Sequence, residues 1–253
     1  MSGSNSSRAR GAVRRRKGID RPDHPAEDLA SRLTVPKDWT FRSTDVVKHF
    51  DSHVRESLPW YEIATGAVAH IARSYIPENG VVIDVGASTG NVGRALSGTL
   101  DARSANLIAL DPSPAMAPAY DAPGQLVIGS AETFDFAGKK PDVVICFLAL
   151  MFVPVASRAD LISRMQAAVQ PGGAIIVVDK MIPRPGYVGT VNFRLTLAAK
   201  YEAGASPAEI IAKELSIAGV QRPMSEEELP GFVEFFRFGD FAGFIWERSA
   251  FIR

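Results

Sequence analysis

The 253-residue chain contains little cysteine and little histidine, and both shortages limit its chemistry. Its one cysteine, Cys146, can form no internal disulfide and cannot by itself build a thiolate zinc site. All four His residues lie between positions 24 and 70. Any chemistry in the last two-thirds of the chain must therefore run without imidazole, and we expect no metal site.

The chain also lacks a long apolar run. No stretch reaches the roughly 20 apolar residues that a membrane-spanning helix needs, and the first residues contain no apolar region of a secretory signal. The composition, with 46% hydrophobic and 22% charged residues, is typical of a globular protein that can bury a substantial core. We expect a cytoplasmic protein without a membrane partner.

Equal numbers of acidic and basic side chains conceal an uneven distribution of charge. Residues 1–21 hold seven Lys or Arg against one Asp, a net charge of +6, and the remainder carries −6. This basic segment is rich in Ser and Gly, so we expect disorder, with an arm and linker over 1–37 before one domain over 38–253. The basic residues of 8–21 can bind nucleic-acid phosphates; a solubilising tail is the alternative.

From residue 81, short apolar runs alternate with helical patterns. Strands buried on both faces are predicted over 81–85, 106–110, 125–128, 143–150 and 174–178. Helices are predicted between them, over 91–100, 113–120 and 157–169. This alternation predicts a doubly wound α/β fold.

Further elements extend this domain at both ends. Two helices are expected before the first strand, the second ending near residue 75, and two more over 189–203 and 206–219. Aromatic-rich strands over 232–238 and 243–248 are joined by a short link, which is typical of an antiparallel pair at a sheet edge. The complete prediction is a mostly parallel seven-stranded sheet with N-terminal helices and an antiparallel C-terminal strand pair.

The strand over 81–85 runs into a glycine-bearing turn that opens a helix. Gly86 and Gly90 let the backbone approach a ligand where a Cβ atom would collide, and the amides of the helix N-terminus face such a ligand. Asp84 precedes the turn, and Asp111 ends the next strand, where a carboxylate can accept two hydrogen bonds from a ribose diol. The pattern predicts a nucleoside-cofactor site.

The spacing favours S-adenosylmethionine (SAM) over a dinucleotide. The glycines follow G-x-x-x-G, with Ala87, Ser88 and Thr89 between them, and not G-x-G-x-x-G. A carboxylate at Asp84 also suits a positively charged amino-acid group better than a pyrophosphate. After the third strand, the segment 129–132 offers a polar side chain and a backbone amide to an adenine edge. A strand–turn–helix without a ligand is the alternative.

At these residues the chain resembles the class I SAM-dependent methyltransferases. The subfamily it most resembles is the carboxy-S-adenosylmethionine (carboxy-SAM) synthases of wobble-uridine tRNA modification. The resemblance runs from about residue 38 to residue 248. It is carried by the motifs DWTF at 38–41, SLPWY at 57–61, IALDPSPAM at 108–116, PGGA at 171–174 and FRFG at 236–239.

The resemblance implies SAM as cofactor and a homodimer with the helices after the fifth strand at its interface. It also assigns roles within the cofactor site. The residues are Tyr61, which closes the site; Gly86, Ala87 and Ser88 along the methionine part; Asp111 at the ribose; Ser130 and Ala131 at the adenine; and Cys146 beside the sulfonium.

The chain departs from the resemblance at Glu214, at Cys146, where the family carries a polar residue, and in a shorter stretch between residues 219 and 232. The synthases carry an arginine that holds the extra carboxylate of their product, and the matching residue here is Glu214. A carboxylate that faces another carboxylate is repelled, and the adjacent Lys213 points about 100° away on a helix. These departures favour ordinary SAM with a different acceptor.

Three functions stay open. The first is a SAM-dependent methyltransferase that acts on a small molecule or a nucleobase; the second is a carboxy-SAM synthase-like enzyme, if an arginine such as Arg194 or Arg222 reaches the pocket. The third is a non-catalytic SAM-fold protein that binds a partner. Methyl transfer depends mainly on proximity and in-line geometry, so no catalytic residue is assigned. Candidate bases or acceptor contacts are Glu132, Asp179, Tyr187, Arg194 and Tyr201.

Overall fold

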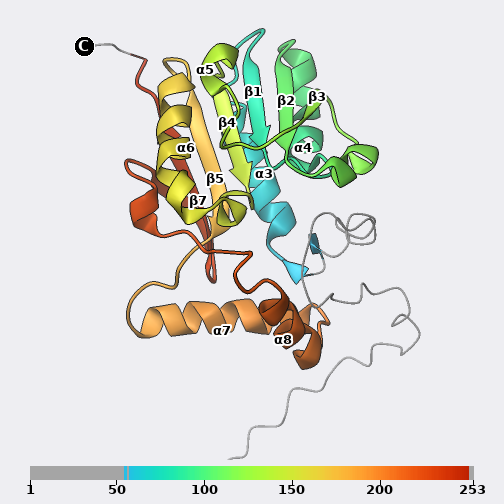
Figure 1. The fold of residues 1–253 in the computed structure, drawn as a ribbon, viewed down its shortest axis with the longest axis vertical. Helices are drawn as coiled ribbons and strands as arrows, with labels where there is room; N and C mark the ends of the chain where they lie inside the picture. The colour runs from blue at the N-terminus through green and yellow to red at the C-terminus, as the bar shows by residue number, and fades with distance from the viewer. Residues whose placement is uncertain (1–53, 56, 251–253) are drawn as a thin grey trace, which may run out of the picture. The chain divides into compact units, whose positions relative to one another are not determined.

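A computed structural model describes residues 54–55 and 57–250, built around a seven-stranded sheet of order β3-β2-β1-β4-β5-β7-β6 (Figure 1). The first five strands along the chain are parallel, and β7 runs antiparallel to both β5 and β6. The predicted fold is therefore confirmed. The strands are β1 (Val81–Val85), β2 (Asn106–Asp111), β3 (Gln125–Ile128), β4 (Val143–Phe147), β5 (Ala174–Lys180), β6 (Val233–Phe238) and β7 (Phe241–Glu247).

Helices connect the strands and extend beyond the sheet. Short 3-10 helices accompany the α-helices in the described residues. The α-helices are α3 (Tyr61–Ala72), α4 (Asn91–Ala102), α5 (Phe136–Lys139), α6 (Val155–Ala168), α7 (Tyr187–Glu202) and α8 (Pro207–Ser216), and the 3-10 helices are η2 (Pro114–Ala119), η3 (Leu150–Phe152) and η4 (Glu226–Glu228).

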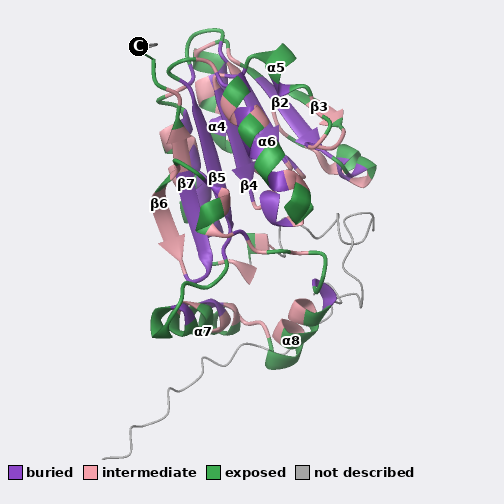
Figure 2. Ribbon diagram, turned by 60° about the vertical axis from the view of Figure 1, so that its left-hand side comes forward, coloured by how far each residue is buried: buried purple, intermediate pink, exposed green. Residues whose placement is uncertain are grey.

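Different helices cover the two faces of the sheet, and the central strands are buried between them (Figure 2). Ile83 of β1 packs in the cluster that contains residues of α5 and α6, whereas Val82 packs in the cluster with α3 and α4. Successive strand residues point to opposite faces. Asp84 therefore lies on the α3–α4 side, and Asp111, which follows Leu107 at an even spacing, lies on the same side.

The strand order places a ligand site at one edge of the sheet. β1 pairs with β2 on one side and with β4 on the other, so the connections diverge between β1 and β4. In open α/β sheets, ligands bind outside the carboxyl ends of the strands at such a switch point. The glycine turn after β1 lies at this edge.

Charged side chains attach α7 and α8 to the sheet. Glu214 of α8 accepts a hydrogen bond from Lys200 of α7 at 2.8 Å and pairs with Lys180 of β5 at 3.5 Å. Lys180 also lies 3.9 Å from Asp240, in the β6–β7 turn, and Asp240 accepts a hydrogen bond from Thr196 of α7. This network holds two helices against the carboxyl end of β5.

Two strands differ from their predictions by more than a shift of one or two residues at an end. The fourth strand ends at Phe147 and not at residue 150, because Leu148 has a φ of 56° and the chain turns into η3. β3 is an edge strand whose residues are exposed or half-buried, so the predicted burial on both faces is wrong for it. Four apolar-rich residues do not distinguish a covered strand from an edge strand.

Some predictions concern residues that the structure does not describe. The basic arm, the domain boundary near residue 37, the motif at 38–41 and the first N-terminal helix up to residue 53 lie outside the described residues and stay predictions. Within the described part of the chain, no helix is long and apolar enough to cross a membrane.

Candidate cofactor site

The turn after β1 adopts a left-handed backbone at three positions. The φ angles are 75° at Gly86, 51° at Ser88 and 95° at Gly90. A Cβ atom on Gly86 would lie 2.7 Å from the Cβ of Ala149, and one on Gly90 would lie 2.5 Å from the Cβ of Ala122. Glycine is therefore needed at both positions because Ala149 and Ala122 of the same protein approach the turn closely. The sequence had predicted a different reason, the close approach of a ligand.

Asp111 at the end of β2 fixes this turn. Its Oδ2 accepts a hydrogen bond from the Ser88 amide at 2.9 Å, and its Oδ1 accepts one from the Ser113 amide at 2.8 Å. Burial raises the pKa of Asp111, and these two hydrogen bonds offset part of the rise. Each carboxylate oxygen can accept a second hydrogen bond. Asp111 can therefore hold a diol while it shapes the turn.

Asp84 at the end of β1 is buried without full compensation. Its side chain is 2% exposed, and among the described residues its Oδ2 has no hydrogen-bond partner. Burial, and secondarily the negative charge of Asp111, raises the pKa of Asp84 to about 7. An unsatisfied buried acceptor costs about 1–3 kcal/mol. A cationic ligand group beside Oδ2 would remove that cost, so this carboxylate fits an ammonium group.

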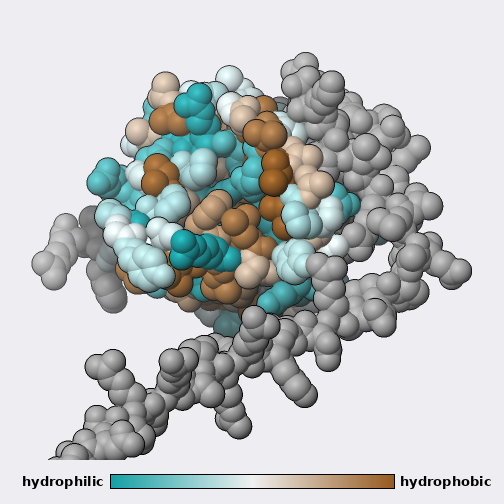
Figure 3. All heavy atoms as spheres, turned by 90° about the horizontal axis from the view of Figure 1, so that it is seen from below, coloured by the Kyte–Doolittle hydropathy of each residue, from teal (hydrophilic) through white to brown (hydrophobic). Residues whose placement is uncertain are grey.

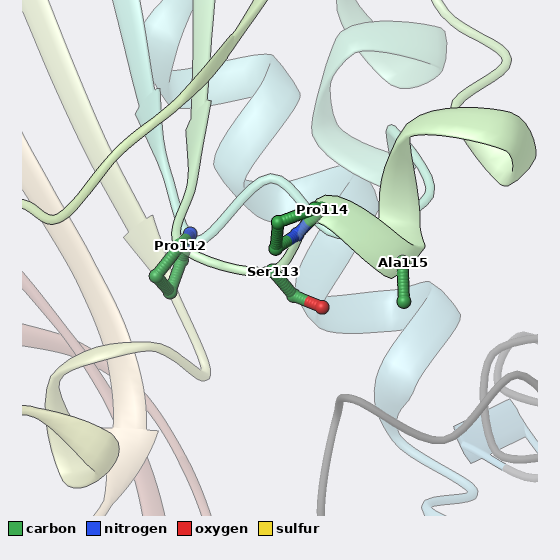
Figure 4. Close-up of a pocket in the computed structure, with 4 residues that line it drawn as sticks. All are labelled: Pro112, Ser113, Pro114 and Ala115. Atoms are coloured by element: carbon green, nitrogen blue, oxygen red, sulfur yellow. The ribbon is translucent and has the colours of Figure 1, made fainter.

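A pocket of about 490 Å³ opens beside the residues that directly follow Asp111 (Figure 4). Its lining includes Pro112, Ser113, Pro114 and Ala115, and the side chains of Ser113 and Ala115 point to the same side of this segment. The volume lies in the range of small-molecule sites. The pocket thus lies directly beside Asp111, the carboxylate that is predicted to bind a ribose.

Tyr61 comes to the carboxyl end of β4 from the start of α3. Its ring is buried and meets the ring of Phe147 edge-on, with 5.3 Å between the centroids. The guanidinium of Arg55 lies 5.5 Å from the centroid of the Tyr61 ring. The structure thus brings Tyr61 to the predicted edge of the sheet, and its contact with a cofactor stays a prediction.

Cys146 lies on the other side of the sheet. Its thiol is completely buried and lies 4.0 Å from the sulfur of Met165 on α6. Burial raises the pKa of the Cys146 thiol well above its usual value. The Cys146 side chain belongs to the hydrophobic core. Its predicted contact with the sulfonium stays a prediction.

The segment after β3 holds the two residues predicted for the adenine. The Ser130 hydroxyl donates a hydrogen bond to the Glu132 carboxylate, and Ala131 is buried. The backbone oxygens of Ala131 and Glu132 accept hydrogen bonds from Arg164 of α6 at 3.3 and 2.8 Å. α6 thus fixes the backbone of this segment, and contact with an adenine stays a prediction.

Sequence reasoning missed several residues that shape the site. Ala149 packs against Gly86, and the sulfur of Met116 accepts a hydrogen bond from the Ser88 hydroxyl at 3.6 Å. The Tyr120 ring lies against Gly90. No local pattern marks these residues, because each contact joins segments far apart in the sequence.

The comparisons with known proteins agree with this geometry. Residues 82–173 match a family described as a methyltransferase domain. The chain is 30% identical over 222 residues to a protein named carboxy-S-adenosyl-L-methionine synthase from Staphylococcus epidermidis, across 83% of this chain and 97% of that protein. The chain belongs to the class I SAM-dependent methyltransferase family. This methyltransferase is also 29% identical over 217 residues to a protein of the same name from Pseudomonas fluorescens, across 81% and 87% of the two chains.

Solved structures confirm the fold of this methyltransferase. The structure titled DhpI-SAH complex matches with a TM-score of 0.52 and 17% identity, over 81% of this chain and 92% of that one. A SAM-dependent methyltransferase from Clostridium acetobutylicum matches with a TM-score of 0.51 and 10% identity, over 80% and 99%. The family identifies SAM as the cofactor, and the unpartnered Asp84 oxygen and the Asp111 carboxylate fit its ammonium and ribose groups.

Proposed function

We propose that this enzyme transfers the methyl group of SAM to a small, partly apolar acceptor. The observation that carries the proposal is the placement of Asp84 and Asp111 on one side of the sheet, at the ends of β1 and β2, with the glycine turn beside them. Bound SAM supplies a methyl group already activated on a sulfonium. The protein's part is then to align the two reactants and to exclude water.

Each acidic side chain has a distinct task in this proposal. Asp84 holds the ammonium of the methionine part, and its buried, unpartnered oxygen supports this assignment. Asp111 accepts hydrogen bonds from the ribose hydroxyls through the lone pairs that the Ser88 and Ser113 amides leave available. Ser130 and Ala131 hold the adenine beyond the pocket at Pro112 and its neighbours.

The residues after β4 support a partly apolar acceptor. Phe147 ends the strand, and Leu148, Met151 and Phe152 follow it at the carboxyl edge of the sheet. Phe147 and Met151 are buried, whereas Leu148 and Phe152 are half-buried. An acceptor bound here would meet mainly apolar side chains, which supports a small or partly apolar substrate.

Glu214 supports ordinary SAM over its carboxylated form. Burial would raise the pKa of Glu214, but the charges and hydrogen bonds of Lys200 and Lys180 outweigh it and hold the pKa below its usual value. The carboxylate therefore stays ionised at neutral pH. Asp240 lies beside Lys180 as a second carboxylate, so the two lysines are balanced and the cluster offers a ligand carboxylate no excess of positive charge.

The second candidate is the synthesis of carboxy-SAM, which the names of the two relatives favour. Mass spectrometry of the bound or produced nucleoside separates the candidates, because the carboxylated form is heavier by one carbon dioxide. We expect ordinary SAM and tighter binding of SAM than of carboxy-SAM. Glu214→Arg should shift the preference towards carboxy-SAM; a wild-type preference for carboxy-SAM would favour the second candidate.

Titration calorimetry with SAM tests the cofactor site. Asp111→Ala should weaken SAM binding about 100-fold or more, because two hydrogen bonds to a charged acceptor contribute roughly 1.5 kcal/mol each. Asp111→Asn keeps the packing and should also weaken binding. The control is Asp101→Ala, an exposed carboxylate near the end of α4, which should bind like the wild type. Unchanged binding by both Asp111 variants would exclude the ribose assignment.

We also propose that two copies associate through α7 and α8. Apolar side chains gather on the face that these helices present (Figure 3). They include Tyr187, Val188 and Val191 of α7 and Ile211 and Leu215 of α8, all exposed. Exposed apolar side chains that gather on two adjacent helices are typical of a protein–protein interface.

A further inference from the structure

Asp179 is a completely buried carboxylate that, among the described residues, accepts its hydrogen bonds from backbone amides. It lies near the end of β5. Its Oδ2 accepts from the amides of Leu150 at 2.7 Å and Met151 at 3.2 Å, and its Oδ1 accepts from the amide of Lys180 at 2.9 Å. One side chain thus joins the end of β5 to the segment that follows β4.

That segment has an unusual backbone and contacts the cofactor turn. Leu148 has a φ of 56°, a left-handed conformation that costs a residue with a Cβ atom about 1–2 kcal/mol. Its amide donates to the Val178 oxygen at 2.7 Å. The next residue, Ala149, packs so closely on Gly86 that a Cβ atom there would lie 2.7 Å from its own Cβ. A shift of Ala149 would therefore move the turn.

Arg158 of α6 holds the same segment from the other side. Its guanidinium is buried and donates to the backbone oxygens of Met151 and Val153. It also donates to the Arg222 oxygen at 2.6 Å and pairs with Glu228 at 3.2 Å. Both backbone groups of Met151 are therefore held by buried charged side chains.

We propose that Asp179 is a positioning residue for the cofactor site. It fixes Leu150 and Met151, which hold Ala149 against Gly86, and this contact sets the place of the glycine turn relative to β4. Asp179 does not serve as a base, because it has no exposed surface through which an acceptor could reach its oxygens. The inference rests on the proposed SAM site, in which the turn holds the methionine part.

Asp179→Asn tests this role, because Asn keeps the shape and replaces one accepting oxygen with an NH₂ group. That group cannot accept, so either the Leu150 and Met151 amides or the Lys180 amide loses its partner. The matched control is Asp142→Asn, since the Asp142 carboxylate accepts from the Val81 amide at 2.8 Å at the opposite edge of the sheet. Both variants lose a carboxylate that binds a strand amide.

We expect Asp179→Asn to weaken SAM binding about tenfold, the result of a loss of roughly 1.4 kcal/mol. Asp142→Asn should bind SAM like the wild type, even where its melting temperature falls by the same amount. Calorimetry on the folded proteins makes the comparison. Equal SAM affinities in the two variants would overturn the positioning role, because a merely structural residue affects stability alone.

Amide hydrogen exchange without ligand gives a second readout. The amides of Gly86 and Ala87 donate to the Leu110 oxygen at 2.8 and 3.0 Å, so their exchange reports on the turn. Asp179→Asn should speed exchange at both positions and Asp142→Asn at neither. If the wild type itself binds no SAM, the cofactor proposal fails, and unchanged exchange in Asp179→Asn would independently overturn the positioning role.

Discussion

At the scale of the residue, Asp84 and Asp111 show how different surroundings give the same type of side chain different pKa values. Asp111 accepts two backbone hydrogen bonds, which offset part of the burial that raises its pKa. Asp84 has no such compensation at Oδ2 and its pKa rises to about 7. The site therefore contains a fixed acceptor beside a carboxyl group whose charge depends on pH and on the ligand.

Asp84→Asn should stabilise the ligand-free protein at pH 8 and weaken its binding of SAM. Between the unfolded pKa of 3.8 and about 7, the folded state retains a proton that the unfolded state has lost, so stability falls as pH rises through this window. Above pH 7, the folded protein bears the full free-energy cost of an ionised, buried Asp84. Asn avoids this cost, a gain of roughly 4 kcal/mol at pH 8 that shrinks towards zero near pH 4.

Urea unfolding at a series of pH values measures this difference, and calorimetry measures the affinity. Asp121→Asn, a carboxylate exposed on the surface, is a suitable control that should change neither quantity. Equal stabilities of wild type and Asp84→Asn at pH 8 would contradict the assignment of an ionised, uncompensated Asp84.

The sequence predicted some site residues and not others for a physical reason. Asp84, Gly86 and Asp111 stand at fixed places relative to two strand ends, so strand periodicity alone locates them. Asp179 and Ala149 act through contacts with residues about 30 or more positions away, and no local pattern encodes such a contact. The sequence marked Asp179 only as a candidate base, a role that its complete burial excludes.

At the scale of the element, local signals located the long helices well. They did not predict the four-residue α5, and the helix predicted over 113–120 is the 3-10 helix η2. α8 begins where predicted, because the Ser206 hydroxyl accepts from the Glu209 amide and Pro207 occupies the first position. The end of β4 was less predictable: the apolar run continues through residue 150, but the left-handed Leu148 stops the strand. Hydrophobicity marks a buried segment without marking where its backbone changes direction.

Leu215→Lys should prevent the association proposed for α7 and α8. Leu215 is 70% exposed, so a lysine there leaves the fold of one copy intact while it places a charge in the apolar surface. Size-exclusion chromatography with light scattering should show a dimer for the wild type and a monomer for the variant. The control is Ile63→Lys on α3, where the side chain is 68% exposed and the dimer should persist. A wild-type monomer would contradict the proposal.

At the scale of the whole molecule, the order of strands decides where the chemistry is. The alternation of strands and helices predicted a doubly wound sheet, and the structure confirms it. The alternation did not predict that β1 and β4 would be neighbours, since this pairing joins residues about 60 positions apart. That neighbour relation creates the switch point and brings Ala149 onto the glycine turn.

The buried Cys146 gives the molecule an internal reporter of unfolding. The chain has no other cysteine, and this one lies in a central strand with no exposed surface, so a thiol reagent should react with it only when the sheet opens. SAM at about 100 times its dissociation constant should slow the reaction about 100-fold. Ellman's reagent measures the rate, and a rate that SAM leaves unchanged would contradict this expectation.

The same reaction offers a search for the acceptor that requires no assay of turnover. Any compound that binds the folded enzyme in the presence of SAM lowers the fraction of open molecules and lengthens the labelling time further. A library of small molecules and nucleosides can therefore be ranked by how much each compound slows the labelling of the Cys146 thiol.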